Sequence, residues 1–401
     1  MDTISRRRCL QVSLAALGAG ALGGCMGGGT AALSPMGAQP FAPATPAPAA
    51  DTIGTGSVKV ALLLPLTGSG QGAVAAQALR NAAELALAEF QRPDLTLLVK
   101  DDRGTPEGAR EAAQAALAEG AELLIGPLFA GTVRAAAEVA RQAGRPMIAF
   151  STDAAVASRG VYLLSFLAQP EVDRIVDFAA SRGRRSFAAL VPETVYGGVV
   201  EAQFREAAAR QGLRVVAIER YPQGQPQAAV QRIASLITGP SAQADALFLP
   251  DNAEGLPAVA QALAQAGFNA QRVKPVGTGV WNDPAVFRIP GLEGGWFAAP
   301  DAAGYNAFAG RYRARFGSDP TRIASLAYDA VSLAAALNRQ YGSQRFDDAT
   351  LTNQAGFAGT DGVFRFRADG TSERALAVLE IRGGATATVS PAPRVLPATT
   401  A

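Results

Sequence analysis

Beyond residue 57 the chain alternates short, almost continuously apolar runs with longer segments whose apolar residues recur every three or four positions. The short runs are typical of parallel strands buried on both faces, and the longer spacing is typical of helices with one buried side. The first pair shows both patterns. Val58–Leu66 predicts a strand, and Leu79, Ala83, Ala86 and Phe90 lie on one side of the helix that follows it.

The alternation continues in two series, which predicts two parallel sheets flanked by helices and joined by right-handed crossovers. Further strands of the first series are expected at Leu95–Val99, Glu122–Ile125, Pro146–Phe150 and Val161–Phe166, with a helix near 131–143. Strands of the second series are expected at Ser186–Val191, Leu213–Arg220, Ala244–Leu249 and Val273–Gly277, between helices near 171–182, 198–211, 226–238 and 254–266. Helices near 304–316 and 322–341, and a hairpin of Gly362–Arg367 with Ala375–Ile381, complete the prediction.

The first 57 residues follow a different pattern. Three arginines, Arg6 to Arg8, precede a short apolar run that ends at Leu22, and Gly23, Gly24 and Cys25 follow. This order is typical of a signal peptide, and the apolar run is too short to span a bilayer. We interpret residues 1–25 as that signal. Residues 26–57, rich in Gly, Ala, Pro and Thr, are expected to form a disordered tether, and residues 385–401 a flexible tail.

Composition narrows the possible chemistry. The 401-residue chain contains no histidine, and its two cysteines are Cys9 and Cys25. A domain beyond residue 25 therefore has no histidine base, no thiolate nucleophile and no Cys/His zinc site. Basic and acidic residues are equal in number after Cys25, so no basic surface for nucleic acid is expected. We predict a protein without a metal or other cofactor, and not an enzyme.

Small residues between the first strand and helix have two interpretations. Gly68-x-Gly70 formally fits a dinucleotide-binding fingerprint, but the acidic residue after the next strand, Asp101, lies further along than that fingerprint requires. The preferred alternative is a loop of small residues at a helix N-terminus, whose free N–H groups could bind an anionic ligand group.

Two aromatic residues lie just beyond predicted strand ends, where open α/β sheets bind ligands. They are Tyr196, which is followed by two glycines, and Trp281. Their rings could stack on a ligand, or they could serve ordinary packing. Both are kept as candidate ligand-binding residues.

An ordered set of short motifs resembles the Leu/Ile/Val-type periplasmic solute-binding proteins. The motifs are Val58–Thr67 (VKVALLLPLT), Ile125-Gly126-Pro127, Pro146–Ser151 (PMIAFS), Tyr196-Gly197 and Ala327-Tyr328-Asp329-Ala330. The resemblance implies the type I periplasmic binding protein fold, an α/β fold with two doubly wound parallel-sheet lobes joined by a three-strand hinge. The domain would span 58–384, with one lobe at 58–167 and 299–358, the other at 168–298 and 359–384, and crossovers near 167–170, 297–301 and 358–362.

The resemblance also implies where a ligand would bind. Members of the family hold an amino acid between the lobes. By position, the carboxylate donors of one lobe match Gly131, Thr132, Ser151, Thr152 and Asp153, and Tyr196 matches a ligand-contacting tyrosine of the other lobe.

The chain departs from the family at two places. Gly279 stands where amino-acid binders tend to carry the acidic partner of the ligand ammonium, and a tyrosine position is lost near Asp251 and Asn252. Because an unpaired buried ammonium is costly to desolvate, free branched-chain amino acids are in doubt unless Asp251 or Asp153 substitutes. Asp251, Asn252 and Trp281 therefore join the candidate ligand-binding residues.

The N-terminus carries two finer resemblances. Leu22-Gly23-Gly24-Cys25 resembles the lipobox of bacterial lipoproteins, which implies lipidation of Cys25 and a membrane anchor. Ser5–Gln11 (SRRRCLQ) resembles the twin-arginine export signal, with Cys9 where phenylalanine is usual. Met26, rather than an aspartate, follows the lipobox and favours the outer membrane of the cell envelope, with the protein facing the periplasm.

Several stretches resemble a subgroup named penicillin-binding-protein activators, lipoproteins linked to peptidoglycan synthesis. They are Gly277–Pro284, Gly294–Pro300, Ala324–Val331 and Leu351–Phe366. Two hypotheses follow. The chain either binds a small polar ligand, such as an amino acid or amide, and delivers it to an ABC permease, or uses the same fold to regulate a cell-wall synthase.

Overall fold

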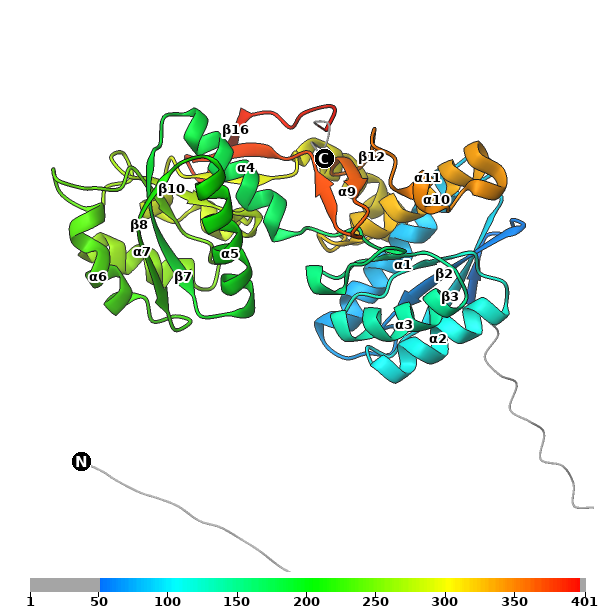
Figure 1. Ribbon diagram of the computed structural model, residues 1–401. Coiled ribbons are helices and arrows are strands. Elements are labelled where there is room, and N and C mark those ends of the chain that lie inside the picture. Colours follow the sequence, from blue (N-terminus) through cyan, green and yellow to red (C-terminus); the bar gives the residue numbers. More distant parts are fainter. Residues whose placement is uncertain (1–50, 397–401) are drawn as a thin grey trace, which may run out of the picture. The chain divides into compact units, whose positions relative to one another are not determined.

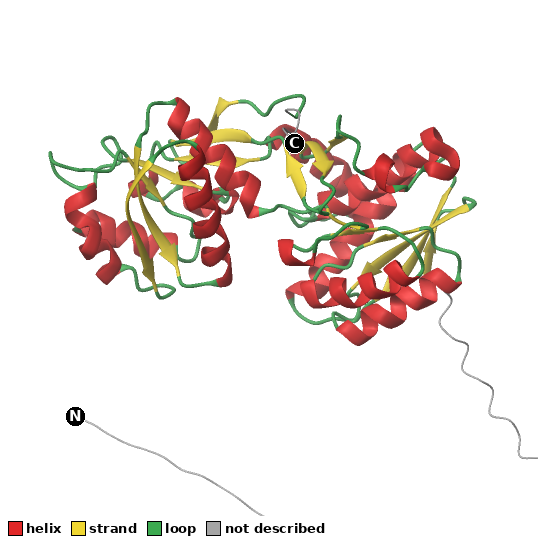
Figure 2. Ribbon diagram, viewed as in Figure 1, coloured by secondary structure: helices red, strands yellow, loops and turns green. Residues whose placement is uncertain are grey.

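The computed structural model describes residues 51–396. The predicted signal peptide, the predicted lipidation site Cys25 and most of the predicted tether lie outside the described residues. Residues 51–396 contain two sheets of mainly parallel strands (Figure 1). Figure 2 shows helices flanking both sheets, which confirms the predicted α/β class.

The first sheet contains strands in the order β1-β3-β2-β4-β5-β6. Its strands are β1 (Asp51–Ile53), β2 (Val58–Leu64), β3 (Leu95–Asp101), β4 (Leu123–Ile125), β5 (Met147–Ala149) and β6 (Val161–Leu163). All neighbours are parallel except β1, which runs antiparallel to β3. The predicted tether, residues 26–57, is therefore too long at its C-terminal end. Residues 51–53 form a strand because β3 offers them an edge to pair with, and composition does not reveal such a contact.

Strand β2 explains why its sequence is apolar throughout. Val60, Leu62 and Leu64 belong to a core shared with α1 and α10, whereas Ala61 and Leu63 belong to a second core with α2 and α3. Successive side chains of a strand point to opposite faces, so a strand covered by helices on both sides must be apolar at every position. The helices of this lobe are α1 (Gln71–Glu89), α2 (Pro106–Ala118), α3 (Ala130–Gln142), α9 (Ala302–Phe316), α10 (Ala324–Tyr341) and α11 (Asp348–Leu351).

The second sheet has the order β16-β15-β11-β10-β9-β7-β8. Its strands are β7 (Ser186–Pro192), β8 (Arg214–Tyr221), β9 (Ala246–Phe248), β10 (Lys274–Gly277), β11 (Trp296–Ala299), β15 (Ala377–Arg382) and β16 (Ala385–Ser390). Helices α4 (Ala168–Ser181) and α5 (Val195–Arg210) contribute to the core on one face, and α6 (Gln227–Ile237) and α7 (Leu256–Gln265) to that on the other. Shorter helical segments are α8 (Pro284–Phe287), η1 (Ala154–Val156), η2 (Gly279–Trp281), η3 (Pro290–Leu292) and η4 (Gly342–Gln344). None of the helices within residues 51–396 is both long and apolar enough to cross a membrane.

The C-terminal part differs from the prediction in its pairing. The expected hairpin of 362–367 with 375–381 does not form, because β13 (Gly362–Phe366) pairs with β12 (Phe357–Gly359) and β14 (Ser372–Arg374). β15 instead pairs with β11 and β16. The segment 385–390, expected as flexible tail, is therefore the edge strand of the second sheet.

The third crossover lies later in the chain than predicted. Phe364 and Phe366 are buried in the core of the first lobe, where Phe366 packs 5.3 Å from the ring of Tyr162. Leu376 is the next residue whose side chain belongs to a core of the second lobe. The chain thus changes lobes after Arg374 rather than near 358–362, because the aromatic residues of β13 complete the first core.

Replacing Phe366 with alanine is expected to lower the free energy of unfolding by about 3–5 kcal/mol, because a fully buried aromatic ring is removed. Denaturant unfolding followed by circular dichroism measures the change. Val395→Ala is the matched control, since Val395 is 71% exposed and its truncation should change stability by at most about 0.5 kcal/mol. A loss at Phe366 no larger than that of the control would contradict the assignment of 357–374 to the first core.

Candidate functional site

The first crossover brings an acidic side chain into the interior. After β6 the chain enters α4, whose first turn contains Pro170 and Glu171. Proline suits this turn because its missing N–H has no helical acceptor there, and a carboxylate is favoured by the positive end of the helix. Glu171 is nevertheless only 7% exposed, so its charge depends on the contacts that the fold supplies.

One of those contacts comes from the loop after β10. The backbone N–H of Gly279 donates to Oε2 of Glu171 at 2.9 Å. A Cβ atom at position 279 would lie 2.4 Å from Oε1 of Glu171. A side chain at position 279 would therefore require the carboxylate of Glu171 to move, so this arrangement depends on glycine there.

Tyr196 lies beside this carboxylate at the start of α5. The helix begins after Thr194, whose hydroxyl accepts a hydrogen bond from the N–H of Gly197 at 2.9 Å, as expected for a capping residue. The Tyr196 hydroxyl is 2.6 Å from Oγ1 of Thr278, with which it shares a hydrogen bond. This bond fixes the ring of Tyr196 next to the loop that carries Gly279.

These groups line a cavity of about 590 Å³, which we call the Glu171 cavity. Its walls come from the loop before and through η1, the first crossover, the first two turns of α5 and the start of η2. Its polar side chains are Thr152, Asp153, Gln169, Glu171 and Tyr196, and its larger apolar ones are Phe166, Val195, Val199 and Val280. The volume and the mixture of apolar surface with a few polar groups are those of small-molecule sites.

Burial controls the ionisation of the cavity. It raises the pKa of Glu171 to about 8, and the Gly279 hydrogen bond and the charge of Arg322 only partly oppose this. Burial, followed by the nearby charge of Glu171, also raises the pKa of the Tyr196 hydroxyl, which therefore stays neutral at physiological pH. The cavity thus contains a carboxyl group that gains or loses its proton near neutral pH.

The structure brings three of the predicted ligand-binding residues into this cavity: Thr152, Asp153 and Tyr196. The carboxylate of Asp153 accepts hydrogen bonds from Arg134 Nη2 at 3.1 Å and from the N–H of Ala155 at 3.0 Å. Because Asp153 already has a basic partner, it is a weaker candidate than Glu171 for pairing with a cationic ligand.

Trp281 does not line the Glu171 cavity, and its burial agrees with the alternative of ordinary packing. The side chain is fully buried in the second lobe, and its Nε1 donates to the carbonyl of Leu249 at 2.9 Å. The ring lies against Gly277, where an added Cβ would approach it to 2.2 Å. Trp281 fills the core beneath the strand end instead of covering the site above it.

Asp251 and Asn252 also serve the protein itself. Asp251 is buried and accepts a hydrogen bond from the Tyr221 hydroxyl at 2.7 Å. Oδ1 of Asn252 accepts from the N–H groups of Glu254 and Gly255 just before α7. Neither side chain lines the Glu171 cavity. In this structure their hydrogen bonds hold the segment between β9 and α7.

Gly131, Thr132 and Ser151, expected to grip a carboxylate, do not line the Glu171 cavity. Thr132 is buried and its hydroxyl donates to the carbonyl of Phe129 at 2.7 Å. Oγ of Ser151 accepts from the N–H of Asp153 at 3.1 Å. The Thr132 hydroxyl thus donates to nearby backbone, and Thr152 is the hydroxyl of this group that faces the cavity.

The residues that the sequence analysis missed come from the first crossover: Phe166, Gln169 and Glu171. The crossover itself was placed near 167–170 from the sequence. The signal that could have identified Glu171 is an acidic residue in the first turn of a helix directly after such a crossover, beside a proline.

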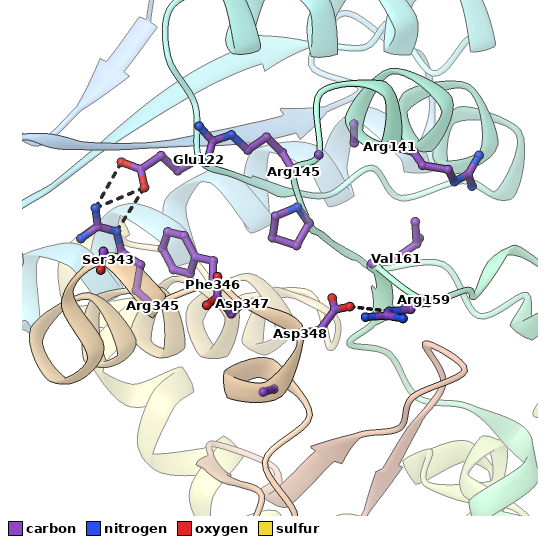
Figure 3. A pocket seen from close by; sticks show the side chains of 15 residues that line it. Glu122, Arg141, Arg145, Arg159, Val161, Ser343, Arg345, Phe346, Asp347 and Asp348 are labelled. Carbon is purple, nitrogen blue, oxygen red and sulfur yellow. Dashed lines mark hydrogen bonds and ion pairs between the residues drawn. The ribbon is translucent and has the colours of Figure 1, made fainter.

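A second cavity, of about 610 Å³, lies at the other edge of the first sheet, before β5 and β6 (Figure 3). Figure 3 shows Arg345 facing Glu122 and Arg159 facing Asp348. Arg345 pairs with Glu122 at 3.2 Å, and Arg159 pairs with Asp348 at 2.6 Å. Ligands of open α/β sheets bind at the carboxyl ends of strands, so the Glu171 cavity is the better candidate site.

The buried carboxyl predicts a pH-dependent stability. In the folded protein burial raises the pKa of Glu171 to about 8, above the ordinary value of 4.5 for a glutamate. The folded state therefore holds the proton more tightly, and stability falls as the pH rises between these two values. The difference in melting temperature between Glu171→Gln and the parent protein is expected to increase by at least about 2 °C from pH 5 to pH 8. A difference that stays constant over this range would show that Glu171 titrates as an exposed carboxyl does.

Comparison with solved structures shows the same fold in several bacterial proteins. A protein of Rhodospirillum rubrum provisionally assigned as a branched-chain amino acid ABC transporter aligns with a TM-score of 0.74 at 21% identity, over 83% of this chain and 99% of its own. A substrate-binding protein of Desulfitobacterium hafniense in complex with Leu gives 0.61 at 19%, over 83% and 99%. A solute-binding protein of R. palustris in complex with benzoate gives 0.58 at 21%, over 85% and 98%.

Comparison with curated protein sequences gives no match. The sequence profile of the family described as periplasmic binding protein matches residues 57–386, which is most of the chain. This match confirms the resemblance to the Leu/Ile/Val-type proteins and the type I fold that it implied. The chain belongs to the periplasmic binding protein family.

Proposed function

We propose that this chain is the solute-binding component of an ABC importer for amino acids or related small molecules, and that its ligand binds in the Glu171 cavity. The observation that carries the proposal is the origin of the cavity walls. They combine Thr152 and Asp153 from the first lobe, the first crossover, and Tyr196 and Gly279 from the second lobe. A ligand held by groups from both lobes can bias the lobes towards a closed arrangement, which is how binding energy drives such a change.

The chemistry of the cavity supports binding rather than catalysis. Tyr196 stays neutral and is hydrogen-bonded to Thr278, and Asp153 is paired with Arg134. The whole chain also has no histidine. Related structures with bound Leu or benzoate support a ligand of similar size, because the volume of about 590 Å³ suits such molecules.

The proposal includes export and anchoring. The order of Arg6 to Arg8, the apolar run and Leu22-Gly23-Gly24-Cys25 supports a lipoprotein held at the cell envelope by acyl chains on Cys25. Met26 after the lipobox favours the outer membrane, and the paired arginines favour the twin-arginine route. A binding protein tethered in this way would stay close to the membrane where its permease resides.

A thermal-shift panel of amino acids, amines and aromatic acids tests the proposal. A ligand at about 100 times its dissociation constant adds about 2.7 kcal/mol to the stability of the folded protein. Val199→Trp is expected to abolish the shift, since the larger side chain fills the cavity from α5, where Val199 is already 39% exposed.

The matched control is Val395→Trp, an exposed position that is not part of the cavity lining, and it should keep the full shift. A shift that survives Val199→Trp would place the ligand elsewhere. No shift with any solute, together with co-purification of a peptidoglycan transpeptidase, would favour the alternative of a cell-wall regulator.

A further inference from the structure

The charged side chains that line the Glu171 cavity are both acidic. They are Asp153 and Glu171, and no lysine or arginine is among the described residues of the lining. Asp153 has Arg134 as its partner at 3.1 Å, whereas no ion pair joins Glu171 to any described residue. The cavity therefore presents one buried carboxyl group with no basic partner among the described residues, and no lysine or arginine that would neutralise an anionic ligand.

The hydrogen bonds of Glu171 leave one of its oxygens available. Oε2 accepts from the N–H of Gly279 at 2.9 Å, and Oε1 accepts no hydrogen bond from the described residues. The absence of a side chain at Gly279 is what keeps the space beside Oε1 open, because a Cβ there would lie 2.4 Å away. A buried carboxylate with a free oxygen is costly unless a donor or a cation meets it.

Two arginines lie close to Glu171 but are engaged elsewhere. Arg322 donates to both oxygens of Asp361, at 3.1 and 2.5 Å, and its guanidinium lies 4.4 Å from the ring centre of Phe166. Arg374 is buried and lies 5.4 Å from the ring centre of Phe166. Phe166 lines the cavity and neither arginine does, so neither replaces a ligand cation there.

The remaining wall is apolar and partly exposed. Val195 is 90% exposed and Val199 39% exposed, and both lie on the side of α5 that lines the cavity. Covering water-exposed apolar side chains with an apolar ligand lowers the free energy of the complex. The lining thus offers a buried acidic group and an apolar surface.

We propose that Glu171 is the specificity-determining residue of this cavity, and that it selects a ligand with a protonated amine on an apolar body by pairing Oε1 with the ammonium group. The inference deepens the proposed function and rests on it. The acidic partner that the resemblance placed at position 279 is supplied here from α4, and a ligand carboxylate is not required for recognition.

The pairing couples binding to proton release. The groups that face Glu171 are Tyr196 from α5, Arg322 from the segment before α10, and Arg374 at the end of β14. The Tyr196 hydroxyl stays neutral, so Glu171 is the group of the cavity lining that titrates near neutrality. With a pKa of about 8, Glu171 must lose its proton before it pairs with an ammonium. The affinity for an amine should rise about tenfold per pH unit between pH 6 and pH 7.

Calorimetry on the full chain tests the inference with three probes: isoamylamine, L-leucine and benzoate. Isoamylamine has the side chain and the amine of leucine without its carboxylate, and benzoate has a carboxylate without an amine. We expect isoamylamine to bind, with the affinity rising between pH 6 and pH 7, and benzoate to bind at least tenfold more weakly. Glu171→Gln should lower the affinity for isoamylamine by at least about 30-fold, which is the effect of removing one partner of a buried charge pair.

Glu254→Gln is the matched control, because Glu254 is an exposed glutamate of the same lobe and is not part of the cavity lining. It should leave all affinities unchanged. Gly279→Ala is a second variant that keeps the acidic group of Glu171 but displaces it. This variant should also lower the affinity for isoamylamine. The pH dependence of the parent protein is a readout that needs no variant.

The possible results separate the inference from the function beneath it. Benzoate binding without amine binding, or amine binding that is equal in Glu171→Gln, would overturn the role of Glu171 and leave a solute-binding cavity in place. Leucine binding without isoamylamine binding would overturn the claim that the carboxylate is not required. Failure of all three probes in the parent protein would overturn this inference, and failure of the whole solute panel would overturn the proposed function too.

Discussion

A carboxylate taken out of water must be met by donors or by positive charge, and at Glu171 this requirement governs the centre of the molecule. The fold supplies one donor, the N–H of Gly279, and in doing so ties the first turn of α4 to the loop after β10. A side chain at position 279 would displace the carboxylate from this position. The contact therefore links the first crossover to the second sheet, and both of its residues line the cavity.

A related cluster of charges fixes the third crossover. Asp361 is fully buried, accepts from Arg322, and also accepts from the hydroxyl of Ser325 at 2.6 Å. Arg322 and Arg374 both lie over Phe166, a residue of the first crossover. Buried charges of this kind are tolerated only with close partners, so the segments that carry them are held together. This explains why the chain leaves the first lobe only after Arg374.

Fold and ligand are separate properties in this family. The compared structures with Leu and with benzoate share the architecture of this chain at 19% and 21% identity, although one ligand carries an ammonium and the other does not. The charge of the lining, and not the order of the strands, must make that distinction. In this chain the lining combines an acidic group from a crossover with valines of α5, which is a different arrangement from an acidic residue at position 279.

The sequence alone determined the fold class and most of its elements, because apolar spacing reports directly which faces of a strand or helix are buried. Strand β2 and helix α10 lie where the pattern predicted them, within one to two residues. Tyr196 was also found from its position after a strand, and Thr152 and Asp153 from the resemblance to the Leu/Ile/Val-type proteins. Only the tertiary structure decided the burial of Trp281, the pairing of β16, and the role of Glu171, whose partner Gly279 is 108 positions away. Such contacts depend on packing between distant segments, and local periodicity contains no information about which distant group will meet a given side chain.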